Sequence, residues 1–154
     1  MEQPASLTRL VLRNVRSIGQ CDIALGPLTW LIGPNGAGKS NVIYALGFLA
    51  DALGSSLGQA LRARGGVAEV RRRSKGHPNH FGIRLDFTVN GRPGHYAFDI
   101  GEVRDQGFEV LTEECSLGGR GKGPYFRIQR GQVEASSEAA FPALTSDQIG
   151  RAHV

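Results

Sequence analysis

The spacing of hydrophobic residues changes from a helical period to a strand period partway along the chain. Val42, Leu46 and Leu49 recur on one helix face, and Gly54-Ser55 predicts the end of that helix. From position 81 onward apolar and polar residues alternate, which predicts an antiparallel meander with one solvated face. The expected elements, in order, are strands at 7–13 and 22–25, a buried strand at 28–32, helices at 42–53 and 57–64, and strands at 81–89, 95–100, 108–117 and 125–130. A loop at 90–94 joins two of these strands as a hairpin.

A glycine-rich motif lies between the buried strand and the first helix: Gly33-Pro34-Asn35-Gly36-Ala37-Gly38-Lys39-Ser40. Two glycines that enclose four residues, followed by Lys and a hydroxyl residue, match the phosphate-binding Walker A loop. Glycines let the chain fold into a ring of inward-pointing N–H groups, because no Cβ atoms block the approach of a phosphate. Strand, loop and helix stand in the required order, so the sequence predicts nucleotide binding.

Two side chains at the end of this motif carry specific roles. Lys39 is placed to reach the β and γ phosphates of a nucleoside triphosphate, and the Ser40 hydroxyl is suited to be a Mg²⁺ ligand. The N-terminus of the following helix adds a favourable dipole for anionic charge. We therefore expect ATP and Mg²⁺ as the bound cofactors.

Length and composition narrow the class of protein. The 154 residues fit one domain, and 40% hydrophobic residues are typical of a soluble globular chain. No apolar run approaches the roughly 20 residues of a membrane span, and residues 1–6 lack the pattern of a secretory signal. Cys21 and Cys115 are far apart and read as free thiols rather than as a disulfide or a metal site. A cytoplasmic protein with no membrane partner is expected.

The net charge of +4 comes almost entirely from arginine, and the basic residues cluster only at Arg71-Arg72-Arg73-Ser74-Lys75. A solvated loop is favoured over a DNA contact there, because no aromatic residues are interleaved. The alternative function is a nucleic-acid-binding module that uses residues 62–75, with DNA as its partner.

Two stretches of the chain resemble the N-terminal lobe of ABC-type ATPase heads, especially the SMC and RecF-like group. They are Leu12-Arg13-Asn14-Val15-Arg16-Ser17 and the run from Leu31 to Asn41 that contains the glycine motif. Bacterial "AAA family" ATPases of the OLD type are similar over about residues 7–90. The resemblance implies that Arg16-Ser17 lies close to the nucleotide and that the complete protein hydrolyses ATP as a head-to-head dimer. The nucleotide ligands that it implies are Asn35, Gly36, Ala37, Gly38, Lys39, Ser40, Asn41 and Arg16.

The sequence departs from that family at the motifs needed for hydrolysis. No apolar run after position 41 ends in the Asp-Glu pair that holds Mg²⁺ and activates water, and Gly118-Gly119 lacks the flanking residues of a signature loop. The chain is therefore expected to bind nucleotide weakly without turning it over.

The expected fold class is accordingly α/β, an incomplete P-loop NTPase domain over residues 1–148. Within it, residues 1–80 form the P-loop lobe and residues 81–135 form antiparallel strands. Residues 149–154 match the translation of a common sequencing adapter and are expected to be a non-native tail. A third functional reading is a small P-loop phosphotransferase, against which the two strands before the motif argue, because small kinases usually begin with the strand that feeds the loop.

Overall fold

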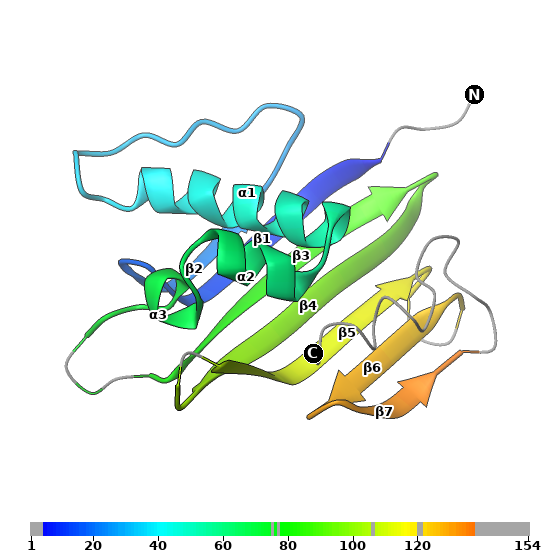
Figure 1. Cartoon of the computed structure of the whole chain (residues 1–154). Coiled ribbons are helices and arrows are strands. Elements are labelled where there is room, and N and C mark those ends of the chain that lie inside the picture. The colour runs from blue at the N-terminus through cyan, green and yellow to red at the C-terminus, as the bar shows by residue number, and fades with distance from the viewer. Residues whose placement is uncertain (1–4, 75, 77, 106, 120–121, 138–154) are drawn as a thin grey trace.

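The computed structural model describes residues 5–74, 76, 78–105, 107–119 and 122–137. Lys75 of the basic cluster and the predicted tail 149–154 lie outside these residues. The described chain forms one seven-stranded sheet with three helices on one face (Figure 1). The elements are β1 (Ser6–Val15), β2 (Ile18–Ala24), α1 (Lys39–Gly54), α2 (Leu57–Ala63), α3 (Val67–Val70), β3 (His80–Val89), β4 (Arg92–Val103), β5 (Gly107–Leu117), β6 (Tyr125–Gln129) and β7 (Gln132–Ser136).

The strand order is β2-β1-β3-β4-β5-β6-β7, and every neighbouring pair is antiparallel. The meander predicted from the alternating pattern is confirmed as β3 to β6, and β7 extends it by one strand that the pattern did not predict. β1 pairs with β2 on one side and with β3 on the other, so both halves of the chain share one sheet. The helices predicted after the glycine motif are confirmed as α1 and α2.

The prediction of a buried strand at residues 28–32 is wrong. This segment pairs with none of the described strands. Leu28, Trp30 and Ile32 are 72%, 76% and 89% exposed, and Leu31 is partly buried against the core. The run is apolar enough for a central strand, but a strand forms only where neighbours accept its backbone hydrogen bonds. An uncovered apolar strip therefore lies beside α1.

The hairpin between β3 and β4 is tighter than the predicted loop at 90–94. Its turn consists of Asn90 and Gly91 alone, with φ of 51° and 72°, and pairing resumes at Val89 and Arg92. Two positive φ values in a two-residue loop match the twist of an antiparallel pair, and Asn-Gly is the preferred sequence for such a turn. The Pro93-Gly94 pair, read as loop, lies inside β4 instead.

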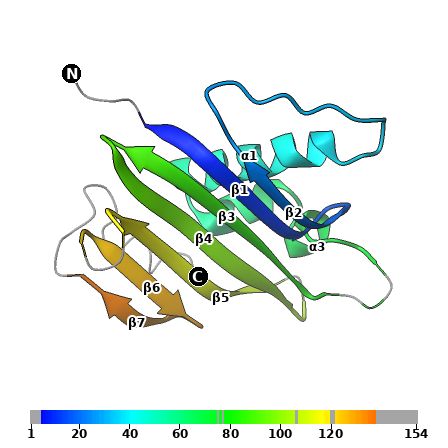
Figure 2. The ribbon, with the colours of Figure 1, turned by 180° about the vertical axis from the view of Figure 1, so that it is seen from behind.

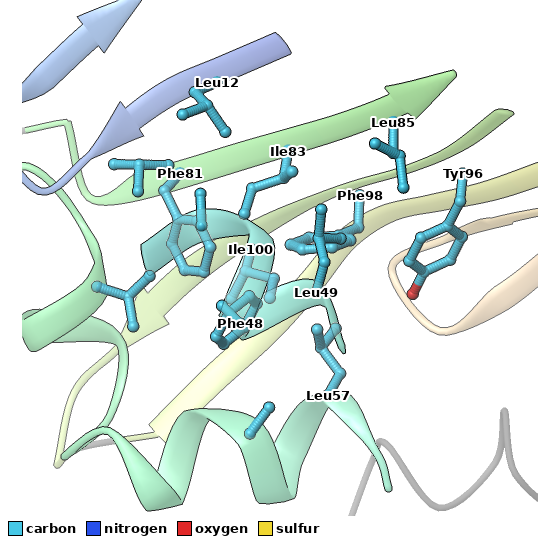
Figure 3. Close-up of a cluster of buried hydrophobic side chains, with 14 of the residues drawn as sticks. Leu12, Phe48, Leu49, Leu57, Phe81, Ile83, Leu85, Tyr96, Phe98 and Ile100 are labelled. Carbon is cyan, nitrogen blue, oxygen red and sulfur yellow. The ribbon is translucent and has the colours of Figure 1, made fainter. Parts of the chain in front are cut away.

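Aromatic rings form the centre of the core between the helices and the sheet. Phe98 has ring centroids 6.0 Å from Phe48, 6.2 Å from Phe81 and 5.7 Å from Tyr96. Phe48 comes from α1 and the other three from β3 and β4, so this cluster fixes the helix on the sheet (Figure 3). Phe48, Phe81 and Phe98 are essentially inaccessible to solvent. This packing positions the start of α1, where the glycine motif lies.

The opposite face of the sheet is open, and Figure 2 shows it without helices in front. Ion pairs lie along this face: Arg9 of β1 contacts Asp22 of β2 at 2.5 Å, and Arg84 contacts Asp86 within β3 at 2.8 Å. Arg13 reaches Asp99 at 2.9 Å. Carboxylates thus already pair with the arginines of this face, which disfavours it as a phosphate-binding surface. No helix in the described part of the chain is both long and apolar enough to span a membrane.

The thiols of Cys21 and Cys115 differ in burial. Burial raises the pKa of Cys115 to about 12 and also raises the pKa of Cys21, which is less buried. The folded state therefore keeps the Cys115 thiol neutral. The stability that this neutral thiol contributes is fully present below pH 9, and it is lost as the pH rises toward 12. Tyr96, whose pKa burial also raises, acts in the same direction.

We expect a maleimide to label Cys21 slowly, and to label Cys115 only after unfolding, because the thiolate is the reactive form. Urea midpoints measured between pH 8 and pH 10 should fall with rising pH, and the fall should shrink in a Cys115→Ala variant. Rapid labelling of Cys115 in the folded protein would contradict its burial.

Candidate functional site

The glycine loop, residues 33–40, joins the exposed segment 28–32 to α1. Gly36 and Gly38 have φ of 83° and 95°, which glycine adopts far more readily than other residues. A Cβ added at Gly36 would meet nothing within 4 Å, so the space beside it is open. The amide of Ala37 donates to the carbonyl of Pro34 at 3.3 Å, and the loop curls back on itself.

Lys39 holds this curled loop together. Its Nζ donates to the carbonyl oxygens of Gly33 and Pro34, both at 2.6 Å. An ammonium group carries three hydrogens, and these two bonds leave one for a ligand. The side chain therefore sets the shape of the loop and also keeps a positive charge beside the open space.

The N-terminus of α1 has backbone donors but no side-chain cap. Gly38 occupies the N-cap position, no side chain accepts a bond from the first turn, and that turn contains no acidic residue. The amides of Asn41 and Val42 bond to the Gly38 carbonyl, whereas those of Lys39 and Ser40 precede the helical hydrogen-bond ladder. With the helix dipole, this arrangement favours an anion at the loop.

A cavity of about 510 Å³ lies against the loop. Gly36, Ala37, Gly38 and Lys39 line one side of it. The exposed Trp30 also borders it, with Leu31, Ile32 and Val42. The remaining lining residues come from β2 and the turn before it; they are Ser17, Ile18, Gly19, Gln20, Cys21 and Ile23. The cavity therefore combines the glycine loop with a wall of mixed apolar and polar residues.

The turn between β1 and β2 packs beside the loop. Asn41 Nδ2 donates to Ser17 Oγ at 2.6 Å, which joins residues 24 positions apart. Arg16 has a φ of 53°, unusual for a residue with a side chain, and its amide donates to the carbonyl of Val70 at 2.8 Å. Its guanidinium lies 4.7 Å from the ring centroid of Tyr44, a cation–π distance. The turn is thus held from both α1 and α3.

A second cavity, of about 440 Å³, adjoins this turn. Arg16, Ser17 and Asn41 line it together with Glu69, Arg71 and Arg73, so Ser17 borders both cavities. Carboxylates already pair with two of its arginines: Arg71 with Glu102 at 2.5 Å, and Arg73 with Glu69. This part of the cavity lining is therefore polar, but carboxylates neutralise the charges of Arg71 and Arg73.

A protein-family profile with the description "AAA domain, putative AbiEii toxin, Type IV TA system" matches residues 28–110, more than half of the chain. The chain belongs to this family of AAA-type P-loop ATPases. It is 30% identical over 136 residues to the "DNA replication and repair protein RecF" of Cronobacter sakazakii, an alignment that covers 79% of this chain. RecF of Magnetococcus marinus is 38% identical over 110 residues, or 63% of this chain.

The third relative is the "OLD nuclease" of Thermus scotoductus, 48% identical over 40 residues, or 26% of this chain. All three relatives are much longer than the aligned region. The chain spans 37% of the Cronobacter RecF, 28% of the Magnetococcus RecF and 8% of the OLD nuclease.

The structure of this AAA-type ATPase chain brings most of the predicted ligand residues together. Residues 36–39 line the first cavity, and Arg16 and Asn41 line the second. Asn35 and Ser40 are exposed at the start and end of the loop. The described residues contain no group of three or more His, Cys, Asp or Glu that could hold a metal ion.

The sequence did not predict that three further residues lie near the candidate site. Ile18 contacts the position where a Gly38 Cβ would be, Tyr44 lies beneath Arg16, and Trp30 borders the loop cavity. The sequence of α1 does not reveal that Tyr44 has an arginine partner. No local pattern identifies Ile18 or Trp30, because their contact with the loop depends on how β2 and the chain after it fold back.

Proposed function

We propose that this chain binds ATP with Mg²⁺ through the glycine loop and that the complete protein hydrolyses ATP. The observation that carries the proposal is the loop itself: a curled glycine backbone, closed by Lys39, opens onto the uncapped N-terminus of α1. Membership in a P-loop ATPase family supports the use of a nucleotide. The cytoplasm, where ATP and Mg²⁺ are available and free thiols persist, is the proposed compartment.

Each residue of the loop fits a part of a triphosphate. The amides of residues 36–39 would surround the phosphate oxygens, and the third hydrogen of Lys39 would meet the β and γ phosphates. The Ser40 hydroxyl, exposed in the first turn of α1, would be a ligand for Mg²⁺, which neutralises phosphate charge when bound. Asn35 would contact the triphosphate from the exposed side of the loop, and Asn41 and Arg16 would border the remainder of the nucleotide.

Hydrolysis requires groups that this sequence does not supply. No apolar run after position 41 ends in an acidic pair that could orient water, and the sequence lacks a signature loop that would complete the site from a second subunit. We therefore propose that turnover takes place in a longer, head-to-head dimer, and that this chain alone binds ATP without cleaving it. The exposed strip at residues 28–32 supports a neighbouring layer of structure in that assembly.

Nucleotide titration followed by the fluorescence of Trp30, the only tryptophan, tests the proposal. Trp30 is 76% exposed and borders the cavity that Lys39 also lines, so a bound nucleotide should change its emission. ATP with Mg²⁺ should bind much more tightly than AMP, because AMP lacks the phosphates that Lys39 would contact. Equal affinity for ATP and AMP would contradict the proposed role of the loop.

A DNA-related role for the complete protein is a second proposal, supported by the names of the RecF and OLD relatives. For this chain alone, carboxylates at Glu102 and Glu69 already pair with Arg71 and Arg73. We expect weak binding to duplex DNA. A plot of log affinity against log salt concentration should have a slope shallower than about −2, because arginines that pair with carboxylates displace few counterions from the phosphates. The nucleic-acid-binding alternative predicts a steep slope instead. ATP should not change that slope, and charge reversal at residues 71–73 should abolish it.

A further inference from the structure

A third cavity, of about 620 Å³, lies on the open face of the sheet, which the helices do not cover (Figure 2). Side chains alternate between the two faces of a strand. Tyr96 of β4 and Cys115 of β5 belong to the core on the helix side. Their chain neighbours therefore point to the open face, and those that line the cavity are His95, Glu114 and Ser116. None of the described residues that line this cavity lines either cavity beside the glycine loop.

The pairing of β4 with β5 brings these three side chains together. His95 and Ser116 are direct register partners, and Glu114 lies two residues before Ser116 on the same face of β5. Diagonal neighbours on one face of a sheet lie within reach of long side chains, so Glu114 can extend to His95. The amide of Gly118 donates to the carbonyl of Pro93 at 2.7 Å, and the two strands therefore stay joined beyond this row.

Hydrogen bonds connect the three side chains in a line. Glu114 Oε1 lies 3.1 Å from His95 Nε2, and Ser116 Oγ lies 3.2 Å from His95 Nδ1. A carboxylate only accepts hydrogen bonds, so Glu114 selects the histidine tautomer that carries its hydrogen on Nε2. Nδ1 then has a lone pair that can accept the proton of the Ser116 hydroxyl. The order of serine, histidine and carboxylate is that of a nucleophile, a general base and the group that orients the base.

Two arginines surround the carboxylate of this line. Arg84 Nη1 lies 3.7 Å from Glu114 Oε1, and Arg127 Nε lies 3.9 Å from Glu114 Oε2. Both arginines also line the cavity, so guanidinium groups border the space where an oxyanion would develop. Carboxylates already offset the charges of these arginines, which favours an uncharged substrate over an anion. The cavity volume is in the usual range for sites that bind small molecules.

We propose that Ser116, His95 and Glu114 form an active site, separate from the glycine loop, that hydrolyses small uncharged carboxylic esters. Ser116 Oγ attacks the carbonyl carbon while its proton moves to His95 Nδ1. The ester C–O bond then breaks, and the alcohol leaves with that proton. Water attacks the acyl-serine and gives a proton to Nδ1, which returns it to Ser116 Oγ as the carboxylic acid is released. Glu114 is a positioning residue, because it acts through His95.

Hydrolysis of p-nitrophenyl acetate by the full chain, together with covalent labelling by a fluorophosphonate, tests this proposal. The phosphonate should attach to Ser116, as located by mass spectrometry. His95→Gln should lower both the labelling rate and kcat at least about 100-fold, because a positioned general base contributes roughly 10²–10⁴-fold. His80→Gln is the matched control and should change neither rate, since His80 is exposed at the start of β3 and does not line the cavity.

Two further variants separate catalysis from a structural role of the same side chains. Ser116→Ala should lose hydrolysis and labelling while circular dichroism and the urea midpoint stay unchanged. Glu114→Gln should lower kcat and leave KM nearly unchanged, because it disturbs the base and removes no contact with the ester. Absence of an adduct at Ser116 in the folded protein, or hydrolysis at the original rate in Ser116→Ala, would overturn the proposal. Neither result bears on nucleotide binding, because the two sites share no lining residue.

Discussion

Replacing Lys39 by alanine should weaken the binding of Mg²⁺-ATP by roughly ten- to hundredfold. The substitution removes a charge-assisted hydrogen bond to the phosphates, which contributes about 1.5–3 kcal/mol. It also removes the two bonds, each 2.6 Å, that tie the ammonium to the carbonyls of Gly33 and Pro34. The loop then loses both its cation and the contact that closes it. Affinity is measured by Trp30 fluorescence or by calorimetry.

Lys122→Ala is the matched control for this variant. Lys122 is exposed and lies between β5 and β6, away from both cavities at the loop. Its substitution removes the same charge from the protein but should leave affinity for Mg²⁺-ATP unchanged. Equal losses in the two variants would show that Lys39 acts only through net charge, and no loss in Lys39→Ala would count against the loop as the binding site.

Replacing Phe98 by alanine should lower the free energy of unfolding by about 3–5 kcal/mol, the usual cost of emptying a buried phenyl site. Phe98 is 1% exposed, and its ring contacts those of Phe48, Phe81 and Tyr96. The substitution therefore leaves a cavity and also breaks three aromatic contacts, each worth about 0.5–1.5 kcal/mol beyond its buried area. Urea denaturation followed by circular dichroism measures the loss.

Tyr125→Ala provides the comparison on the same sheet. Tyr125 begins β6 and is 36% exposed, so its truncation should cost less than about 1 kcal/mol. Folded domains are stable by only about 5–15 kcal/mol, so Phe98→Ala should bring this protein close to unfolding. A similar small loss for both variants would mean that the ring cluster does not hold α1 on the sheet.

Strands and helices whose partners are near in sequence could be predicted from the pattern alone. The strict alternation from Phe81 to Val89 determines β3, because a period of two places one face against the core. The segment at 28–32 shows the limit of this reasoning. An apolar run reads the same whether or not neighbouring strands exist to pair with it, and that depends on the rest of the fold.

The candidate site also has one part that the local sequence predicts and another part that depends on the rest of the fold. The glycine motif specifies the loop residues, because positive φ at Gly36 and Gly38 and a lysine at the helix start are local requirements. Contacts that join distant segments are not local. The bond between Asn41 and Ser17, and the position of Arg16 over Tyr44, arise only when the β1–β2 turn packs against α1. No periodicity in the sequence encodes these pairs.

Amide chemical shifts measured with and without Mg²⁺-ATP would locate the bound nucleotide directly. If the glycine loop holds the triphosphate, the largest shifts should fall on residues 36–41, with smaller ones at Ser17 and Ile18 across the cavity and none in β6 and β7. The Lys39→Ala variant should lose these shifts at the same ATP concentration. Shifts confined to residues 71–74, or no shift in the loop at saturating ATP, would contradict nucleotide binding by the loop.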